Sequence, residues 1–151
     1  MDLRAELTPP SVSQQRLDTL CCEIERIADL VTSRSASADE AIRAFNARMG
    51  HDYVALDFAE YDASRSLVEF ATEAARPARP RVAEITRNEL VEMVHRIRTG
   101  CPETDYYLRL LEANAPHPRV SDLIFHPRAE LRDATAEQIV DELLAYRPIA
   151  L

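Results

Sequence analysis

HPRVSDLIFHP, residues 117–127, is an unusual segment for a soluble protein. A His-Pro pair stands at each end, and Asp122 precedes three large apolar residues, Leu123, Ile124 and Phe125. Proline lacks a backbone N–H and disfavours the helical conformation in the residue before it, so only a short helix fits between the two pairs. The segment is therefore either buried material that closes a core or a rigid support that presents side chains to a partner.

The side chains of this segment are expected to divide between those two roles. Leu123 and Ile124 are predicted to be buried, because one face of a short helix must close the bundle. Asp122 either caps the helix by accepting hydrogen bonds from its first backbone N–H groups or contacts a partner, and the two roles are compatible. His117 fits a hydrogen-bonded structural role better than a metal-binding one.

Amphipathic helices are predicted on both sides of the segment, because apolar residues recur there at helical spacing. Gly50 and Gly100 are typical of helix ends. No segment shows the alternation of β-branched residues that a strand needs, so the predicted fold class is all-α. Helix starts are marked by capping boxes, in which a Ser or Thr stands three positions before a Glu or Gln, at Ser11–Gln14, Ser66–Glu69, Thr86–Glu89 and Thr135–Gln138.

The segment ARPARPRVAEIT, residues 75–86, marks the clearest boundary in the chain. Its two prolines cannot continue a helix, and with their alternating arginines they indicate an extended, basic linker. We therefore predict an N-terminal helical accessory domain at residues 1–75, a linker at 76–83 and a four-helix domain at 84–151. Both halves are acidic: residues 1–75 hold 14 acidic residues and 7 arginines, and residues 84–146 hold 12 and 7.

The order of a helix, a second helix, a short irregular segment and a last helix occurs in both halves. HDYVALDFAEYDA, residues 51–63, takes the place of the 117–127 segment in the first half and is predicted to be a loop or a single turn. Each irregular segment begins with a histidine and continues into an apolar and aromatic cluster. Either a degenerate tandem duplication or the shared geometry of helical bundles explains this pattern. Under duplication, Phe58 and Tyr61 become candidate contacts with a partner.

Composition and charge exclude several classes of function. No apolar run approaches the ~18 residues that a membrane-spanning helix needs, and the N-terminus lacks the pattern of a secretory signal, so we predict a cytoplasmic protein without membrane contact. The net charge is −8, whereas nucleic-acid binding needs clustered basic residues, so nucleic acid is not a predicted partner. The negative charge either favours a basic protein partner or serves solubility alone.

No arrangement of residues in the sequence indicates catalysis, a cofactor or a metal. The three cysteines, including the adjacent pair Cys21 and Cys22, fit neither a disulfide framework nor a zinc site and are predicted to lie in the core. The four histidines lack metal-ligand spacing, and the two glycines form no phosphate-binding loop. The protein is therefore predicted not to be an enzyme and to bind no cofactor.

Residues 117–127 resemble the hallmark motif of the colicin and pyocin immunity proteins, the immunity family of DNase-type bacteriocins. That motif is a His-Pro pair, two variable residues and then Ser-Asp-Leu-Ile-Tyr-Tyr-Pro on a short third helix; this chain departs from it at Phe125 and His126. The flanking segments ITRNELVEMVHRI, DYYLRLLEANAPHP and TAEQIVDELLAYR are similar to the family's first, second and fourth helices. The resemblance covers residues 84–148 and leaves residues 1–80 outside it.

The resemblance implies a four-helix domain that is not an enzyme and that binds a cognate nuclease beside its HNH active site. In the family, the second helix supplies most of the specificity, and an Asp and two Tyr of the short third helix form a shared anchor. Nucleases are basic, so an acidic inhibitor also gains association rate from electrostatic steering. The predicted partner-binding residues are Glu103, Asp105, Tyr106, Glu112, Asp122, Phe125, His126 and Pro127.

On the predicted second helix, Glu112 stands five residues before the His-Pro pair and matches an acidic position of the family. The connection between the first and second helices is shorter than in the family. Glu103, Asp105 and Tyr106 are therefore candidates only as exposed residues of the variable face. Of the two adjacent tyrosines, Tyr106 is expected to point outward and Tyr107 inward.

The two departures from the motif bear on the target. Phe125 keeps an aromatic ring without the hydroxyl, and His126 keeps a donor on a smaller, pH-sensitive ring. They favour an alternative function, an immunity-like inhibitor of a toxin that is not a DNase. A helical adaptor or dimerisation module without any toxin is the second alternative. The sequence leaves the oligomeric state open, and a monomer is expected for the free inhibitor.

Overall fold

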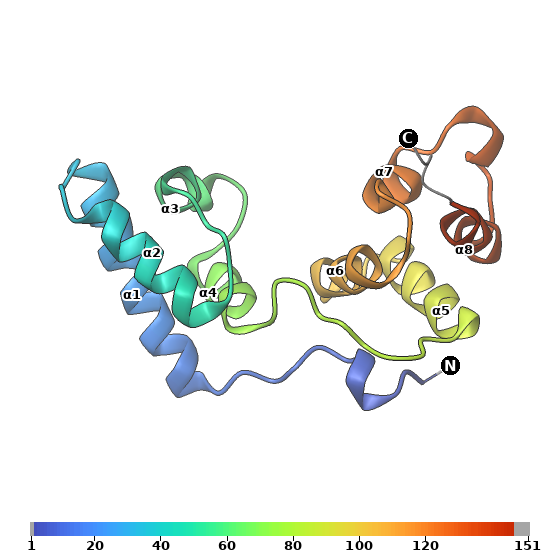
Figure 1. The fold of residues 1–151 in the computed structure, drawn as a ribbon, viewed down its shortest axis with the longest axis horizontal. Coiled ribbons are helices and arrows are strands. Elements are labelled where there is room, and N and C mark those ends of the chain that lie inside the picture. Colours follow the sequence, from blue (N-terminus) through green and yellow to red (C-terminus); the bar gives the residue numbers. More distant parts are fainter. Residues whose placement is uncertain (1, 147–151) are drawn as a thin grey trace, which may run out of the picture. The chain divides into compact units, whose positions relative to one another are not determined.

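A computed structural model describes residues 2–146 of the chain (Figure 1). Every regular element in this range is an α-helix or a 3-10 helix, so the predicted all-α class is confirmed. No helix within it is both long and apolar enough to cross a membrane. The described part divides into a first unit, residues 10–78, and a second unit, residues 2–9 together with 79–146. The predicted domain at 84–151 ends in residues 147–151, which lie outside the described range.

The first unit is built on one long helix. This helix, α1 (Gln14–Thr32), packs against the other three helices of the unit, α2 (Ala38–Met49), α3 (Ala55–Glu60) and α4 (Leu67–Ala75). Apolar residues at helical spacing place one stripe of each helix inward. The buried core consists of Leu20, Ile24, Ile27, Ile42, Phe45, Phe58, Phe70, Ala71 and Ala74.

The helix ends of the first unit follow local chemistry. The Ser66–Glu69 capping box is confirmed, since the Glu69 backbone N–H donates to the Ser66 hydroxyl at 3.1 Å and the Ser66 N–H donates to the Glu69 carboxylate at 3.0 Å. Gly50 ends α2 with a φ of 70°, a left-handed conformation that glycine adopts without strain. The prediction that Ser11 caps the first helix is wrong, because the hydroxyl that accepts the capping hydrogen bond belongs to Ser13.

A helix replaces the loop or single turn predicted at residues 51–63. Six residues form α3, and a 3-10 turn, Tyr61–Ala63, follows them. Phe58 of α3 is 1% exposed and lies in the aromatic core, with its ring edge-on to Phe45 at 5.7 Å between centroids. The proposal that Phe58 contacts a partner is therefore wrong. Tyr61 is half-buried against the same core.

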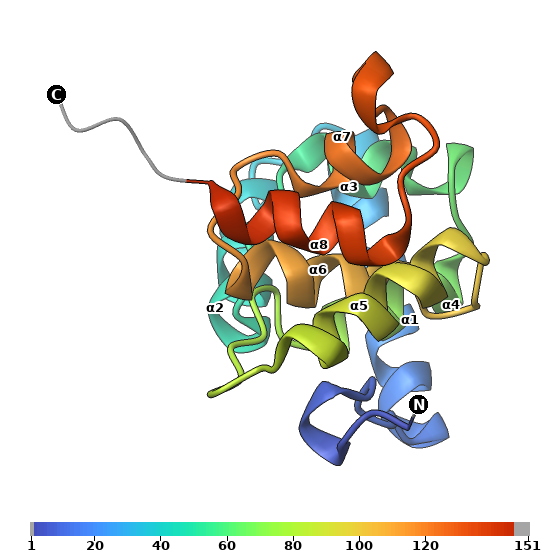
Figure 2. The same ribbon diagram turned by 90° about the vertical axis from the view of Figure 1, so that its right-hand side faces the viewer.

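The second unit is a bundle of four helices, α5 (Arg87–Arg98), α6 (Thr104–Asn114), α7 (Val120–Phe125) and α8 (Ala136–Ala145), with 3-10 helices at Ala5–Leu7 and Ala129–Leu131 (Figure 2). Helix α5 packs against α6 and α8, and the short α7 packs against the same two helices. The predicted capping boxes of Thr86 with Glu89 and Thr135 with Gln138 start α5 and α8. These helices enclose a single buried core.

Residues 2–9 pack with this second unit. Leu3 and Leu7 are buried there, and Arg4 bonds to Glu89 on α5 through Nε and Oε2 at 2.9 Å. The sequence-based boundaries instead assigned this arm to a domain at residues 1–75. Part of the predicted linker is also held, because the Asn114 side chain on α6 donates to the Pro80 carbonyl and accepts from the Val82 N–H.

The two units share an order of elements but pack differently. Helices α3 and α7 are each six residues long and come third in their units. However, α3 packs against α1 and α2, the first two helices, whereas α7 packs against α6 and α8, the second and fourth. The two histidines also differ in role: His51 Nε2 lies 2.7 Å from the Arg76 carbonyl, and His117 Nδ1 accepts from the Arg119 N–H. Common ancestry of the units stays a hypothesis.

Candidate protein-interaction face

Helix α7 divides its side chains cleanly between core and solvent. Leu123 and Ile124 are 7% and 8% exposed, so their predicted burial is confirmed. Asp122 and Phe125 of α7 and its C-cap residue His126 stand at positions i, i+3 and i+4 and are all exposed. Side chains with this spacing share one face of a helix. We call these three residues the α7 face.

The Asp122 carboxylate at the start of α7 has no hydrogen-bond or ion-pair partner within residues 2–146. Arg119 is the N-cap residue, and its own backbone N–H donates to His117 Nδ1 at 3.0 Å, which gives His117 the structural role predicted for it. Asp122 is the third residue of the helix, and its side chain makes no hydrogen bond or ion pair within residues 2–146. The predicted capping role of Asp122 is therefore wrong, and its charge faces solvent.

The end of α7 presents an aromatic ring. Phe125 is 48% exposed, and it is the one large hydrophobic side chain that is exposed in the described part of the second unit. The His126 N–H closes the last turn by donating to the Asp122 carbonyl at 2.8 Å, and the half-buried Pro127 follows. A proline directly after the last turn cannot extend the helix. Phe125 is thus held on a short, fixed element.

Helix α6 contributes a second exposed stripe. Asp105 and Glu112 are exposed and lie seven residues apart, which is close to two helical turns, so they share a face. Glu103 is the half-buried N-cap residue of the helix. The prediction that Tyr106 points outward is wrong: Tyr106 is 6% exposed and Tyr107 is 4% exposed, and both belong to the core. Tyr106 is therefore not accessible to a partner.

Ion pairs in the second unit gather on α5 and α8. Arg87 of α5 contacts Asp141 of α8 through two hydrogen bonds, at 2.9 and 3.1 Å, and this guanidinium holds the pKa of the Asp141 carboxyl below its ordinary value. Arg128 likewise contacts Glu142 of α8 at 2.7 Å. The carboxylates of Asp105, Glu112 and Asp122 have no such arginine within residues 2–146. These three carboxylates are therefore left without an ion pair in this range.

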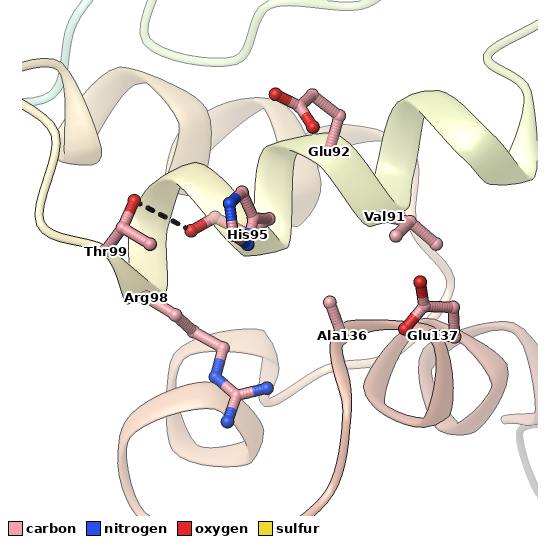
Figure 3. A pocket seen from close by; sticks show the side chains of 7 residues that line it. All are labelled: Val91, Glu92, His95, Arg98, Thr99, Ala136 and Glu137. Carbon is pink, nitrogen blue, oxygen red and sulfur yellow. Dashed lines mark hydrogen bonds between the residues drawn. The ribbon is translucent and has the colours of Figure 1, made fainter. Parts of the chain in front are cut away.

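A pocket of about 430 Å³ lies between α5 and α8 (Figure 3). Sequence reasoning did not predict it, because its lining side chains come from helix faces far apart in the chain. Two of its polar groups are already used by the fold: Glu92 accepts from Arg96 at 3.1 Å, and Arg98 donates to the Ala134 carbonyl at 2.8 Å. The lining residues are Val91, Glu92, His95, Arg98, Thr99, Ala136 and Glu137.

Possible metal ligands are scattered through the described chain. Within residues 2–146, no group of three or more His, Cys, Asp or Glu side chains is placed to hold a metal ion. All three cysteines are free thiols. Cys21 is half-buried, and burial raises the pKa of its thiol, but Cys22 is exposed, so the predicted core position of Cys22 is wrong.

Comparison with known proteins finds a similarity in the second unit. Residues 82–148 match the family model described as colicin immunity protein / pyocin immunity protein. The match confirms the predicted resemblance of the C-terminal part to this family, and it supports a role in bacteriocin immunity. No curated protein and no solved structure matched the chain. The matched range includes α5, α6, α7 and α8 and therefore both exposed stripes described above.

Proposed function

We propose that this chain is a bacteriocin immunity protein that binds and inhibits a cognate nuclease toxin of the HNH type. The observation that carries the proposal is the α7 face, where an exposed aromatic ring lies on the same helix as a carboxylate without a hydrogen-bond or ion-pair partner among the described residues. By the resemblance of residues 117–127 to the family's motif, these positions correspond to the family's anchor. The proposed contacts are the α7 face, Pro127, and Asp105 and Glu112 on α6. Glu103 lies at the edge of this surface, and Tyr106 supports it from the core.

Charge and rigidity favour binding in different ways. The unpaired carboxylates of Asp105, Glu112 and Asp122 attract a basic nuclease and raise the association rate, an effect that salt screens. Phe125 is held on a helix whose other face is packed into the core, so little conformational entropy is lost when it is covered. A central aromatic residue of this kind is typically worth ~2 kcal/mol or more of binding free energy. The protein acts by covering the toxin's DNA-binding surface and performs no catalysis.

The test is co-purification of the tagged chain with its partner from the cytoplasm of its own host, followed by titration of the identified partner. We expect a basic nuclease toxin. The double variant Asp122→Ala/Phe125→Ala should weaken its affinity at least a hundredfold, because both proposed anchors are removed. The matched control is Asp133→Ala, which removes an exposed carboxylate of the same unit outside the proposed contacts. Equal loss in the control, or binding that persists in the double variant, contradicts the proposal.

A toxin that is not a DNase is the second candidate, and the residues at 125 and 126 favour it. The family has tyrosines there, whereas Phe125 offers no hydroxyl and His126 is a smaller, exposed ring. Restoring both tyrosines by Phe125→Tyr/His126→Tyr separates the two candidates. Tighter inhibition of a colicin-type DNase favours an altered member of the DNase group, and loss of the native partner without any gain favours a different toxin. The adaptor module predicts a self-associated chain in which Phe125 is covered. A dimer in light scattering supports that alternative instead.

A further inference from the structure

Helix α3 of the first unit carries exposed apolar side chains that the proposed function does not use. Val54, which precedes the helix, is 58% exposed, and Leu56 in its first turn is 60% exposed. They are two residues apart in the chain, so both lie at the start of α3. Asp52 and Glu60, both exposed, flank them on either side. We call these four residues the α3 face.

The fold of the first unit does not explain the two apolar side chains. Val54 is the N-cap residue of α3, where Ser, Thr, Asp or Asn would stabilise the helix by accepting a hydrogen bond, which valine cannot do. Its backbone N–H is instead satisfied by the Asp57 carboxylate at 2.8 Å. Leu56 lies away from the core, which α3 reaches through Phe58. Neither side chain caps the helix or fills the interior.

The segment that precedes α3 is held in one position by its neighbours. The Asn46 side chain on α2 donates to the Tyr53 carbonyl at 2.9 Å and accepts from the Tyr53 N–H at 3.0 Å. The Tyr53 hydroxyl donates to Glu73 on α4 at 2.7 Å, and the His51 ring, stacked on Tyr53, bonds to the Arg76 carbonyl. Val54 and Leu56 are therefore presented on a fixed backbone, as a preorganised binding surface requires.

The unpaired charge around the α3 face is acidic. Residues 49–64 contain Asp52, Asp57, Glu60 and Asp62, and the arginines on either side, Arg48 and Arg65, are paired with Glu23 and Glu73. Asp57 is used by the helix start, but Asp52 and Glu60 have no ion-pair partner in the part of the chain that the structure describes. An apolar centre with an unpaired acidic rim is complementary to a basic surface with an apolar recess, and it repels nucleic acid and a second acidic copy of the chain.

We propose that the α3 face is a second protein-binding site, which docks a basic protein surface through Val54 and Leu56 at its centre. Asp52 and Glu60 steer the partner, so binding weakens as salt rises. The site lies in the first unit, outside the region that matches the immunity family. It is independent of the α7 face, and either proposal can fail while the other stands.

Site-specific cross-linking in the full-length chain locates the partner. A photoreactive residue replaces Leu56 in one version of the protein and Val68 in the control, since Val68 is similarly exposed, at 53%, but lies on α4. The version with the probe at position 56 should cross-link a basic protein in host lysate that the control does not. The absence of a cross-link specific to position 56, or cross-linking to a second copy of the chain or to an acidic protein, overturns the proposal.

Titration of the purified, identified cross-linked protein then separates binding from folding. Val54→Ser/Leu56→Ser should weaken its affinity about tenfold or more, while the urea midpoint of the chain stays unchanged or rises, because serine can cap α3. Asp52→Asn/Glu60→Gln should reduce the salt dependence of binding. The proposal is overturned if the double variant loses as much free energy of unfolding as free energy of binding. It is also overturned if Val68→Ser loses as much affinity as the double variant. Phe125→Ala should leave this affinity unchanged.

Discussion

Glu89 links the start of α5 to the N-terminal arm of the chain. Its carboxylate accepts from the Thr86 N–H at 2.9 Å and from Arg4 Nε at 2.9 Å, and its side chain is 9% exposed. The hydrogen bond from the Thr86 backbone is the main cause that lowers the pKa of Glu89; burial opposes it, and the charge of Arg4 adds to it. A carboxyl whose pKa is lower in the folded state stabilises the fold when it is ionised.

The Glu89→Gln variant tests this charge. Glutamine at this position can still accept from Thr86, so the variant removes the ionic part of the interaction and keeps the capping pattern. We expect it to lower the free energy of unfolding by about 1 kcal/mol at pH 7. The deficit should persist down to the ordinary glutamate pKa of about 4.3 and then disappear as pH falls through the lower folded-state value. Urea unfolding from pH 7 to pH 2.5 measures it, and a pH-independent deficit contradicts the ionic role.

Single residues were predictable where local sequence decides their environment. Leu123 and Ile124 are buried as expected, because a short helix has one face to place against the core. Tyr106 and Tyr107 were expected to split, since neighbours in a helix point about 100° apart. Both are buried because α6 packs against α5 on one side and α7 on the other, which covers a wider arc than one neighbour would. Such double coverage depends on tertiary packing and leaves no local signal.

At the scale of elements, capped helices were predictable and the short α3 was not. A capping box is a local pattern, and those at Ser66, Thr86 and Thr135 all form. Helix α3 lacks periodicity, and six residues are too few for a stable isolated helix. It is held by the aromatic cluster around Phe58, whose partners come from other helices. Tertiary packing therefore decides α3, and sequence periodicity does not report it.

The capping boxes also allow the two units to be perturbed one at a time. Ser66→Ala removes the cap of α4 in the first unit, and Thr135→Ala removes the cap of α8 in the second. Each should lower the stability of its own unit by about 1 kcal/mol. Hydrogen exchange of the α4 and α8 amides should report each loss separately. If Ser66→Ala accelerates exchange in α8 as much as in α4, the two units unfold together and the expectation is wrong.

At the scale of the whole chain, the division into two units does not follow the order of the sequence. The prolines at residues 77 and 80 correctly indicate a break in helix, but the assignment of residues 2–9 to the second unit has no sequence signal. Two leucines on a short arm fit either core equally well by composition. In chain order, the first unit is inserted between the arm and the rest of the second unit. Residues 82–148, the range that matches the immunity family, lack the arm.

The arm should be a structural part of the second unit even though it lies outside the family match. Leu7 is fully buried in the same core as α5, α6, α7 and α8, so Leu7→Ala leaves a cavity there and should cost about 2–5 kcal/mol of that unit's stability. The matched control is Leu56→Ala, the same change at a side chain that is 60% exposed, expected to alter stability by less than about 0.5 kcal/mol.

Hydrogen exchange measures where the cost of Leu7→Ala falls. Amides of α5 and α8 should exchange faster, and those of α1 and α4 should keep their rates, because Leu7 belongs to the second core alone. Binding through the α7 face should weaken only under conditions that unfold the second unit, since Leu7 supports that core and lies outside the α7 face. If α5 and α8 keep their exchange rates in the Leu7→Ala variant, the arm does not stabilise this core. Residues 82–148 would then be stable without it.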